Sequence, residues 1–456
     1  MSEVPFSDPP PAPLAHGTPR VVSAKTILPA DVNQDALRVL SRLQRNGFEA
    51  YLVGGCVRDL LLGRKPKDFD VATAAHPRQI KRLFRNGRII GRRFRLVHVV
   101  YGPHVIETST FRSDPLAQEN SGEPDEEPED LLITEDNVYG TAAEDARRRD
   151  FTVNALFYDP NAKKILDYVD GLSDIEAHVL RTIGPPAKRF AEDPVRILRA
   201  IKFATRLGFR IEEETWQALC DASGLLSRSA PPRVAEEILR LLRSGTALGA
   251  FRMLRASGAL AVLFPEIDNY LGRRDDPDPA AHDRADLYWR LLEALDADIH
   301  AGNEPTPAVL LAVLYLRVIE QRAAERGISE DPAAFARVAS DVIEPLAGSA
   351  RLPRRATEGA KRIIASQYRF TQASTKNFRR LLFLRSEDFP EALHLFRLRS
   401  AAWGQGWDVY EGWVERYKHA RELAPDEVDV QKKKRRRRGG RRRGRGASDG
   451  PASPAS

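Results

Sequence analysis

The spacing of apolar positions divides the chain into two regions. Between residues 48 and 170, short apolar runs alternate with stretches of helical spacing, a pattern typical of an α+β domain. After Gly184 helical spacing alone continues, beginning with the segments 195–207, 215–226 and 233–243. The pattern therefore predicts an α+β N-terminal head with a mixed sheet, followed by an all-α neck and body.

The same pattern places the individual elements. In the head, strands are expected at residues 50–53, 67–71, 88–100 and 105–110, and helices at residues 31–46, 57–62 and 77–85. A hairpin is expected from residues 151–158 and 164–169, because the turn sequence Asp159-Pro160-Asn161 separates them. Farther along, helices are expected at residues 247–263, 308–318, 335–342, 378–384 and 403–417. No strand is expected after residue 184.

Three segments lack the apolar residues that a packed core requires. They are residues 1–30, rich in proline, residues 114–130, rich in acidic side chains, and residues 426–456, rich in arginine. Such compositions predict disorder, because too little apolar surface is available to offset the entropy of folding. The expected ordered domains are the head at residues 31–183, the neck at residues 184–245 and the body at residues 246–425.

The most informative residues follow the first strand expected in the head. Gly54 and Gly55 end that strand and open a helix, whose first N–H groups favour a phosphate. Asp68 and Asp70 come next, and strand alternation directs both carboxylates to one face. Paired carboxylates suit Mg²⁺, which completes its shell with triphosphate oxygens and water. Glycine pairs usually mark only turns, and D-x-D sequences often lie on solvated strands, but their conjunction indicates a metal–nucleotide site.

Most of the positive charge lies near the end of the chain. Residues 432–445 carry eleven lysines and arginines, and subtracting these charges from the formal net charge of +7 leaves about −4 for the rest. Such a polycation suits loose binding to RNA phosphates, and the alternative is a solubilising end without a partner.

Composition also bears on the compartment. Two cysteines, Cys56 and Cys220, are too few for a disulfide framework or a cysteine-based zinc site, so a reducing cytoplasm is expected. No apolar run reaches the ~20 residues of a membrane helix, and the N-terminus lacks a signal-peptide pattern. We therefore expect no membrane span.

Four motifs, in their order along the chain, resemble the class II nucleotidyltransferases, the family of bacterial poly(A) polymerases and tRNA CCA-adding enzymes. They are LVGGCVRDLLLG at residues 52–63, KDFDV at 67–71, RRRDFTVNAL at 147–156 and EDPVRILRA at 192–200. The matching segments cover roughly residues 48–245. The resemblance implies a polymerase-beta-like head that holds Mg²⁺ on Asp68 and Asp70, and a helical neck that reads the incoming base.

The resemblance also implies roles for individual residues. Asp150 is implied as a further catalytic aspartate. Glu107, on the strand expected at residues 105–110, is a second candidate to complete the metal site, and the alternative for it is an ordinary glutamate on the strand surface. Asp193 and Arg196, three apart on an expected helix, are implied to offer an acceptor and a donor to the base; without the resemblance they would be interpreted as an intrahelical salt bridge. The implied nucleotide-binding residues are Gly54, Gly55, Arg58, Arg149, Asp193, Arg196, Arg199 and Lys202.

Lys202 departs from the family pattern, which usually has arginine at this position. Lysine keeps the charge but loses the planar fork of arginine, so a bidentate contact is not expected there. Each of the implied arginines, taken singly, would be interpreted as a solvated surface charge. Only the set as a whole indicates a triphosphate site.

Weaker features separate the two kinds of enzyme. Residues 83–86 and 90–99, and the arginine-rich extension, resemble bacterial poly(A) polymerases. We therefore expect a template-independent enzyme that adds AMP from ATP to RNA 3′ ends by a two-metal mechanism, releasing pyrophosphate, in mRNA processing and decay. The expected partners are ATP and RNA 3′ ends. The alternatives are a tRNA CCA-adding enzyme and a non-catalytic RNA-binding protein, although Asp68 and Asp70 argue against the latter.

Overall fold

The computed structural model describes residues 18–91, 95–113, 138–273, 279–328, 332–349, 352–371 and 380–422. The chain divides into two compact units, residues 1–304 with 342–354, and residues 305–341 with 355–456. The insert at 114–130 and the arginine-rich segment at 432–445 lie outside the described residues. The expected borders after residues 183 and 245 both fall within the first unit and stay predictions.

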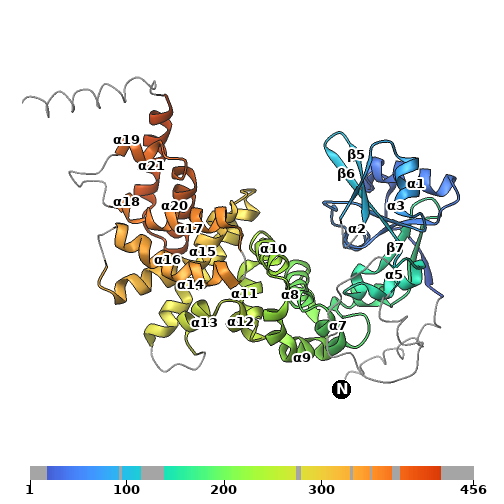
Figure 1. Cartoon of the computed structure of the whole chain (residues 1–456), viewed down its shortest axis with the longest axis horizontal. Helices are drawn as coiled ribbons and strands as arrows, with labels where there is room; N and C mark the ends of the chain where they lie inside the picture. Colours follow the sequence, from blue (N-terminus) through green and yellow to red (C-terminus); the bar gives the residue numbers. More distant parts are fainter. Residues whose placement is uncertain are drawn as a thin grey trace, which may run out of the picture. The chain divides into compact units, whose positions relative to one another are not determined.

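The first unit begins with an eight-stranded mixed sheet (Figure 1), which confirms the expected α+β head. The strand order is β1-β8-β7-β2-β3-β6-β5-β4, and β3 and β6 are parallel whereas the other neighbours are antiparallel. The strands are β1 (Arg20–Ser23), β2 (Ala50–Val53), β3 (Asp70–Thr73), β4 (Gly87–Ile90), β5 (Leu96–Tyr101), β6 (His104–Thr110), β7 (Leu156–Asp159) and β8 (Lys164–Asp167).

Helices cover the two faces of this sheet. On one face lie α1 (Gln34–Arg45) and α3 (Pro77–Leu83). The apolar side chains of α1 recur every three or four residues, and the Asn33 side chain caps its first turn. On the other face, Ala142 and Ala146 of α5 (Ala142–Arg148) pack with Val53, Ala72 and Phe157. The short helices α2 (Gly55–Leu61) and α6 (Gly171–Glu176) and the 3₁₀ turns η1 (Pro29–Asp31) and η2 (Thr152–Asn154) complete the head.

Two expectations about the head strands were wrong. Residues 20–23, expected to be disordered, form the edge strand β1, because Val21 and Val22 pair with the distant strand β8. This pairing spans most of the head, so no local pattern reveals it. The strand expected at residues 88–100 is two antiparallel strands, β4 and β5.

The second expected hairpin is confirmed as β7 and β8, but it begins later than expected. Residues 152–154 form a 3₁₀ turn instead of extended strand. The carboxylate of Asp150 accepts a hydrogen bond from the backbone N–H of Phe151, and local bonds of this kind compete with a strand ladder.

The remainder of the first unit is helical apart from a two-stranded sheet of β9 (Val179–Leu180) and β10 (Arg210–Ile211). The expectation of no strand after residue 184 was therefore wrong, although β10 is only two residues long. Gly258, at φ +80°, separates two helices where one was expected at residues 247–263. The helices are α7 (Pro186–Glu192), α8 (Val195–Leu207), α9 (Glu213–Ala222), η3 (Ser223–Arg228), α10 (Pro231–Leu242), α11 (Ala247–Ala256), α12 (Ala259–Leu263), α13 (Pro265–Leu271) and α14 (Pro279–His300).

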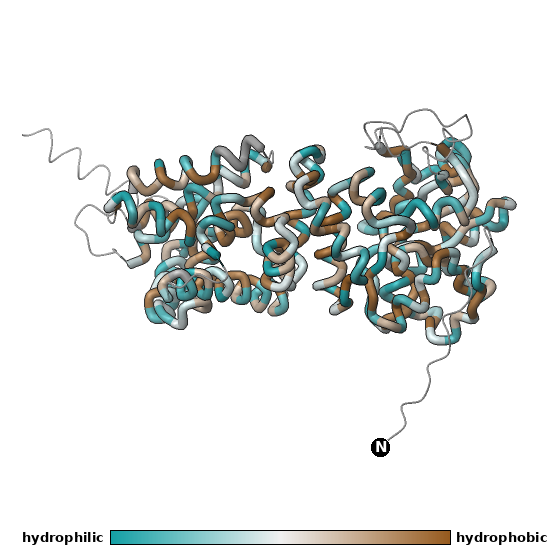
Figure 2. The backbone as a smooth tube through the Cα atoms, turned by 90° about the horizontal axis from the view of Figure 1, so that it is seen from below, coloured by the Kyte–Doolittle hydropathy of each residue, from teal (hydrophilic) through white to brown (hydrophobic). Residues whose placement is uncertain are grey.

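The second unit is built from helices around an aromatic core. Phe370 contacts the rings of Phe383, Phe389, Phe396 and Trp413, whose indole N–H donates to the Phe370 carbonyl at 3.0 Å. Figure 2 shows hydrophobic and hydrophilic residues alternating along the backbone, as amphipathic helices require. Its helices are α15 (Pro307–Glu325), α17 (Arg354–Ala365), α18 (Tyr368–Thr371), α19 (Arg380–Leu384), α20 (Phe389–Trp403) and α21 (Trp407–Glu422), and α16 (Pro332–Ser349) contributes residues to both units.

A helix was expected at residues 403–417, and its predicted first residue was wrong. Trp403 ends α20, and α21 begins at Trp407. Gly404 and Gly406 lie between them with φ +68° and +86°, backbone conformations that interrupt a helix. Among the described helices, none is both long enough and apolar enough to cross a bilayer.

Candidate active site

A cleft of about 1150 Å³ in the first unit brings the predicted site residues together. Its walls come from the β2–α2 turn, the start of β3, the segment after α5, and the helices α8 and α10. The predicted residues that line it are Gly54, Gly55, Arg58, Asp68, Asp70, Arg149, Asp150, Asp193, Arg196, Arg199 and Lys202. The roles implied for them stay predictions, but their meeting at one place is a property of the fold.

The β2–α2 turn requires glycine. Gly54 has φ +76°, and a Cβ atom at this position would lie 3.1 Å from Nη1 of Arg149. Arg58, one turn into α2, is only 2% exposed. Its guanidinium donates to the Asp59 carboxylate at 2.7 Å and to the side-chain oxygen of Asn154. The turn thus exposes backbone without side chains to the cleft, and the buried guanidinium of Arg58 lies next to it.

Asp68 and Asp70 both line the cleft, but the expectation of a strand over residues 67–71 was wrong in its start. Asp70 begins β3, whereas Asp68 precedes the strand and is exposed, and Phe69 between them is buried. Register places Glu107 of β6 opposite Asp70. Burial, followed by the negative charge of Glu107, raises the pKa of Asp70 to about 6. In the described parts of the chain, no lysine or arginine forms an ion pair with Asp68 or Asp70.

Asp150 has a different environment. One carboxylate oxygen accepts from Arg199 at 2.6 and 2.8 Å, and the other accepts from the Phe151 backbone at 2.9 Å and the Asn154 amide at 3.1 Å. Burial alone would raise its pKa, but the charge of Arg199 and these hydrogen bonds lower the pKa of Asp150 to about 2. Both oxygens of Asp150 are thus engaged with protein donors, whereas strand register places Glu107 beside Asp70.

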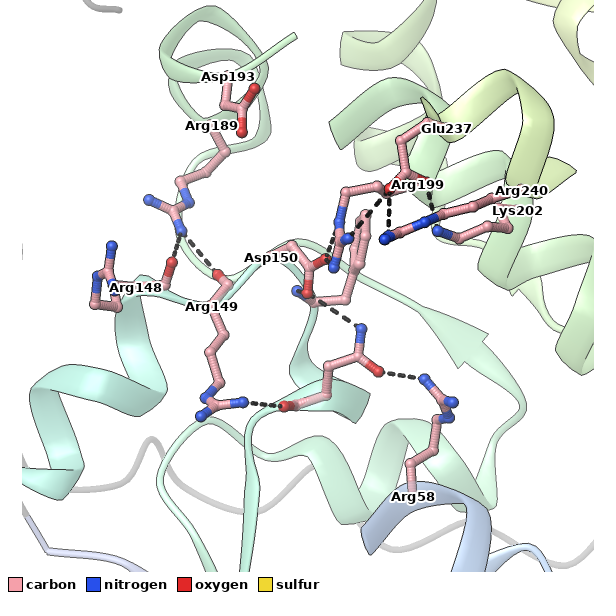
Figure 3. Close-up of polar contacts among 12 residues, drawn as sticks. Arg58, Arg148, Arg149, Asp150, Arg189, Asp193, Arg199, Lys202, Glu237 and Arg240 are labelled. Carbon is pink, nitrogen blue, oxygen red and sulfur yellow. Dashed lines mark hydrogen bonds and ion pairs between the residues drawn. The ribbon is translucent and has the colours of Figure 1, made fainter. Parts of the chain in front are cut away.

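Arg199 connects Asp150 to the α10 side of the cleft (Figure 3). Its guanidinium lies 3.6 Å from the carboxylate of Glu237, which also accepts from Arg240 at 3.0 Å and contacts the Lys202 ammonium. Glu237 is 5% exposed, so one buried carboxylate contacts three cations. The resulting chain of contacts runs from the head into the helices that follow it.

An aromatic ring lies beneath three of these cations. The ring of Phe203, one turn after Arg199 on α8, lies 5.0 to 5.3 Å from the charged groups of Arg58, Arg199 and Lys202. Cations at this distance from an aromatic face are attracted by its quadrupole. Phe203 therefore holds positive charge at the cleft without neutralising it.

Arg149 lies on the opposite wall. Its guanidinium donates to Asp145 at 2.8 and 3.1 Å and stacks at 5.4 Å over the ring of Phe157. The backbone carbonyls of Arg148 and Arg149 each accept from Arg189 at 2.7 Å. These contacts fix the segment that leads into Asp150.

The expectation that Asp193 and Arg196 share one helix was wrong. Pro194 excludes helical geometry at the preceding residue, so Asp193 (φ −149°, ψ 89°) joins α7 to α8. Both its carboxylate oxygens accept from Arg233, at 2.9 and 2.7 Å. Arg196 donates instead to Glu192 at 3.1 Å and to the Arg189 carbonyl at 2.9 Å. The simple intrahelical salt bridge is therefore not formed between them.

Sequence reasoning missed several residues that line the cleft, among them Asn154, Phe203, Arg233 and Glu237. Phe203 had a signal, because it follows Arg199 by four residues and so lies on the same helix face. Asn154 stands inside one of the four motifs, but no role was expected for it. Arg233 and Glu237 belong to α10, whose approach to α8 no local pattern reveals.

Three segments of the chain match models of known protein families. Residues 50–181 match the family model described as the poly A polymerase head domain. Residues 208–271 match the model of a probable RNA- and SrmB-binding site of polymerase A, and residues 327–447 match the polymerase A arginine-rich C-terminus.

Individual relatives and a solved structure agree as well. Poly(A) polymerase I of Salmonella typhi is 38% identical over 374 residues, covering 81% of this chain and 79% of that protein. A CCA-adding enzyme of Lactobacillus delbrueckii subsp. bulgaricus is 36% identical over 270 residues, covering 58% and 64%. The Bacillus stearothermophilus CCA-adding enzyme in complex with CTP superposes with a TM-score of 0.61 at 25% identity, covering 85% and 81%. The chain therefore belongs to the nucleotidyltransferase family that contains the bacterial poly(A) polymerases and the CCA-adding enzymes.

Proposed function

We propose that this chain is a polynucleotide adenylyltransferase that adds AMP from ATP to RNA 3′ ends without a template and releases pyrophosphate. The observation that carries the proposal is the cleft in which Asp68 and Asp70 face a wall of fixed cations. Similarity to poly(A) polymerase I over 81% of the chain favours an enzyme that uses ATP alone. A CCA-adding enzyme would use both CTP and ATP. We further propose that the enzyme works in the cytoplasm, in mRNA processing and decay.

Asp68 and Asp70 fit a divalent cation, for which we propose Mg²⁺, and Glu107 lies beside Asp70 on the neighbouring strand. The described residues contain no group of three His, Cys, Asp or Glu side chains that could hold an ion unaided. That arrangement suits Mg²⁺, which takes a few carboxylates and completes its shell with substrate phosphates and water. When bound, the ions would activate the RNA 3′-hydroxyl and offset charge on the leaving pyrophosphate. Burial, and after it the negative charge of Glu107, raises the pKa of Asp70, and a bound cation would favour the ionised carboxylate.

The cations of the cleft fit the triphosphate. Arg199 and Lys202 lie on one side and Arg149 on the other, each held by a carboxylate before the substrate arrives. Such preorganised charges need no reorientation when negative charge develops at the phosphates. Gly54 and Gly55 let the backbone approach the phosphates closely, because neither presents a Cβ atom.

Asp193 and Arg196 fit the edge of the base. A carboxylate accepts from an exocyclic amino group, and a guanidinium donates to the adjacent ring nitrogen. Adenine and cytosine both present an amino group beside a ring acceptor, whereas uracil does not. Arg196 is 8% exposed, so the base would have to meet it at the floor of the cleft.

Incorporation assays with one nucleotide at a time test the function. Purified full-length protein, Mg²⁺ and an unstructured RNA are expected to give long tails with ATP alone and little extension with CTP, GTP or UTP. A requirement for CTP together with a tRNA acceptor would instead identify a CCA-adding enzyme. RNA binding without any incorporation would support the non-catalytic alternative.

The arginine-rich segment gives a second prediction. Deleting residues 432–456 removes eleven basic side chains, so RNA affinity is expected to fall and its dependence on salt to flatten, since the salt slope scales with the number of phosphates that the protein neutralises. Filter binding at several salt concentrations measures both effects. A variant that keeps these residues but carries acidic substitutions in the N-terminal segment 1–17 serves as a control for net charge. An unaltered slope in the deletion would show that the segment does not touch RNA.

A further inference from the structure

The sheet face that bears the catalytic carboxylates extends beyond them as a row of polar side chains. Register places Glu107 of β6 opposite Asp70, His98 of β5 opposite Glu107, and Arg88 of β4 opposite His98. Directly opposed residues of neighbouring strands point to the same face of a sheet. We call Arg88, His98 and Glu107 the polar row, and it runs from Asp70 to the edge strand.

The polar row is open, unlike the rest of this face. Over β2, β3 and β7 the face is closed by α5, whose Ala142 and Ala146 pack on the sheet. Over β6, β5 and β4 the Glu107 side chain is 54% exposed and the His98 side chain 27% exposed. Two apolar residues on the same face, Val105 and Ile90, are 44% and 41% exposed. The described part of the chain therefore leaves a mixed polar and apolar surface bare beside the carboxylates.

His98 and Glu107 are already connected to each other. Nε2 of His98 lies 3.3 Å from Oε1 of Glu107, and this contact holds both side chains on the open face. The His98 ring retains a second nitrogen and a flat face for other contacts. Arg88, at the end of the row, supplies a charged planar donor. The row thus offers a cation, an imidazole and apolar side chains within reach of the carboxylates.

A single-stranded RNA end fits this combination. Arg149, Arg199 and Lys202 line the cleft, and under the proposed function they contact the triphosphate. The attacking 3′-hydroxyl must then approach the carboxylates from another direction. Bases of single-stranded RNA stack on flat side chains, the phosphates pair with arginine, and the 2′-hydroxyl takes a hydrogen bond.

We propose that the polar row seats the 3′-terminal nucleotide of the acceptor RNA. His98, fixed by Glu107, contacts the terminal ribose or base, and Arg88 contacts the phosphodiester before it. This inference rests on the proposed function, because it assigns the acceptor side of the same site. It places the acceptor on the sheet, and the incoming nucleotide against the helices α8 and α10.

Variants of the full chain test the seat. His98→Ala and Arg88→Ala are each expected to raise the KM for RNA about tenfold and to leave the KM for ATP unchanged. His98→Ala removes a hydrogen bond to the ribose or base, and Arg88→Ala removes a charge-assisted one to the phosphate. His98→Gln, which keeps a donor toward Glu107, is expected to recover part of the loss. His104→Ala is the matched control, because His104 makes the same kind of contact, 3.3 Å to Asp35, from a position of β6 whose side chain points to the opposite face.

A binding measurement separates this inference from the proposed function. Fluorescence anisotropy compares a labelled RNA with a single-stranded 3′ end with a blunt hairpin of the same length, and it needs no turnover. Both variants are expected to weaken binding of the single-stranded end about tenfold and to leave hairpin binding unchanged. Equal affinities in the wild type and both variants would overturn the inference, as would a rise in the KM for ATP alone. Failure of the wild type to incorporate AMP would count against the proposed function and not against the seat.

Discussion

Replacing Asp70 by asparagine is expected to reduce AMP incorporation by at least about 10³-fold, because a neutral amide would not hold the divalent cation that we propose to activate the hydroxyl. RNA affinity should stay within about twofold, because Asp70 is not among the residues that we propose to bind the RNA. Single-turnover incorporation and filter binding measure the two effects. Incorporation at the wild-type rate would show that Asp70 is not a cation ligand. Asp221→Asn, an exposed carboxylate on α9, serves as the control.

The same variant is expected to be more stable than the wild type without metal. The pKa of Asp70 is raised from 3.8 to about 6, so the folded state binds this proton more tightly than the unfolded state does. The contribution of Asp70 to the free energy of unfolding is therefore most favourable below about pH 4, and it is lost as the pH rises through about 6. At pH 8 the cost of keeping Asp70 ionised is about 3 kcal/mol, and asparagine avoids it.

Thermal unfolding at pH 8 tests this expectation directly. Metal-free Asp70→Asn should melt above the metal-free wild type, and Mg²⁺ should raise the melting temperature of the wild type alone, since a ligand stabilises only the form that binds it. A variant that melts lower than the wild type would contradict the raised pKa. An equal response of both proteins to Mg²⁺ would place the cation elsewhere.

Asp150→Asn should have the opposite effect on stability. The pKa of Asp150 is lowered from 3.8 to about 2, so its ionised form stabilises the fold at pH 7 by about 2.5 kcal/mol. That contribution is present above about pH 4 and is lost as the pH falls through about 2. The variant should unfold at lower urea concentration than the wild type at pH 7. Asp170→Asn is the control, because the exposed Asp170–Arg20 pair, 3.8 Å apart, should contribute less than about 1 kcal/mol.

Activity should also fall in Asp150→Asn, for a positional reason. Without the carboxylate, Arg199 loses the partner that aims it into the cleft and keeps the longer contact of 3.6 Å with Glu237. We expect a rise in the KM for ATP larger than the fall in kcat, because a group that orients a phosphate contact acts mainly on binding. A fall in kcat with an unchanged KM for ATP would instead support the directly catalytic role implied for Asp150 by the resemblance.

The two aspartates show how far residue type alone can be interpreted. Both stand in the motifs that carry the family resemblance, and both line one cleft. Burial raises the pKa of both aspartates, and the charge of Glu107 raises that of Asp70 further, whereas the charge of Arg199 from a distant helix and local hydrogen bonds lower that of Asp150. Neither neighbour is adjacent in the sequence, so the difference between the two carboxylates required the fold.

Local signals sufficed where the cause was local. The strand at residues 50–53 and the helix at residues 195–207 were predicted with the bounds that the structure has, since apolar spacing and the flanking glycines Gly54 and Gly208 mark both. The predicted element boundaries were wrong where a side-chain hydrogen bond or a proline changes the local backbone, as at Asp150 and Pro194. The strand β1 was not predicted, because its partner β8 is separated from it by most of the head sequence.

The sequence by itself determined the chemistry: two carboxylates behind a glycine turn, a set of arginines in ordered motifs, and an α+β head before a helical body. Those features depend on residue type and short spacing, which the chain carries directly. Only the tertiary structure decided which carboxylate stands beside Asp70, which cations Glu237 gathers, and where the sheet stays open at His98. These arrangements arise from strand register and helix packing between segments far apart in the chain, and no local pattern encodes them.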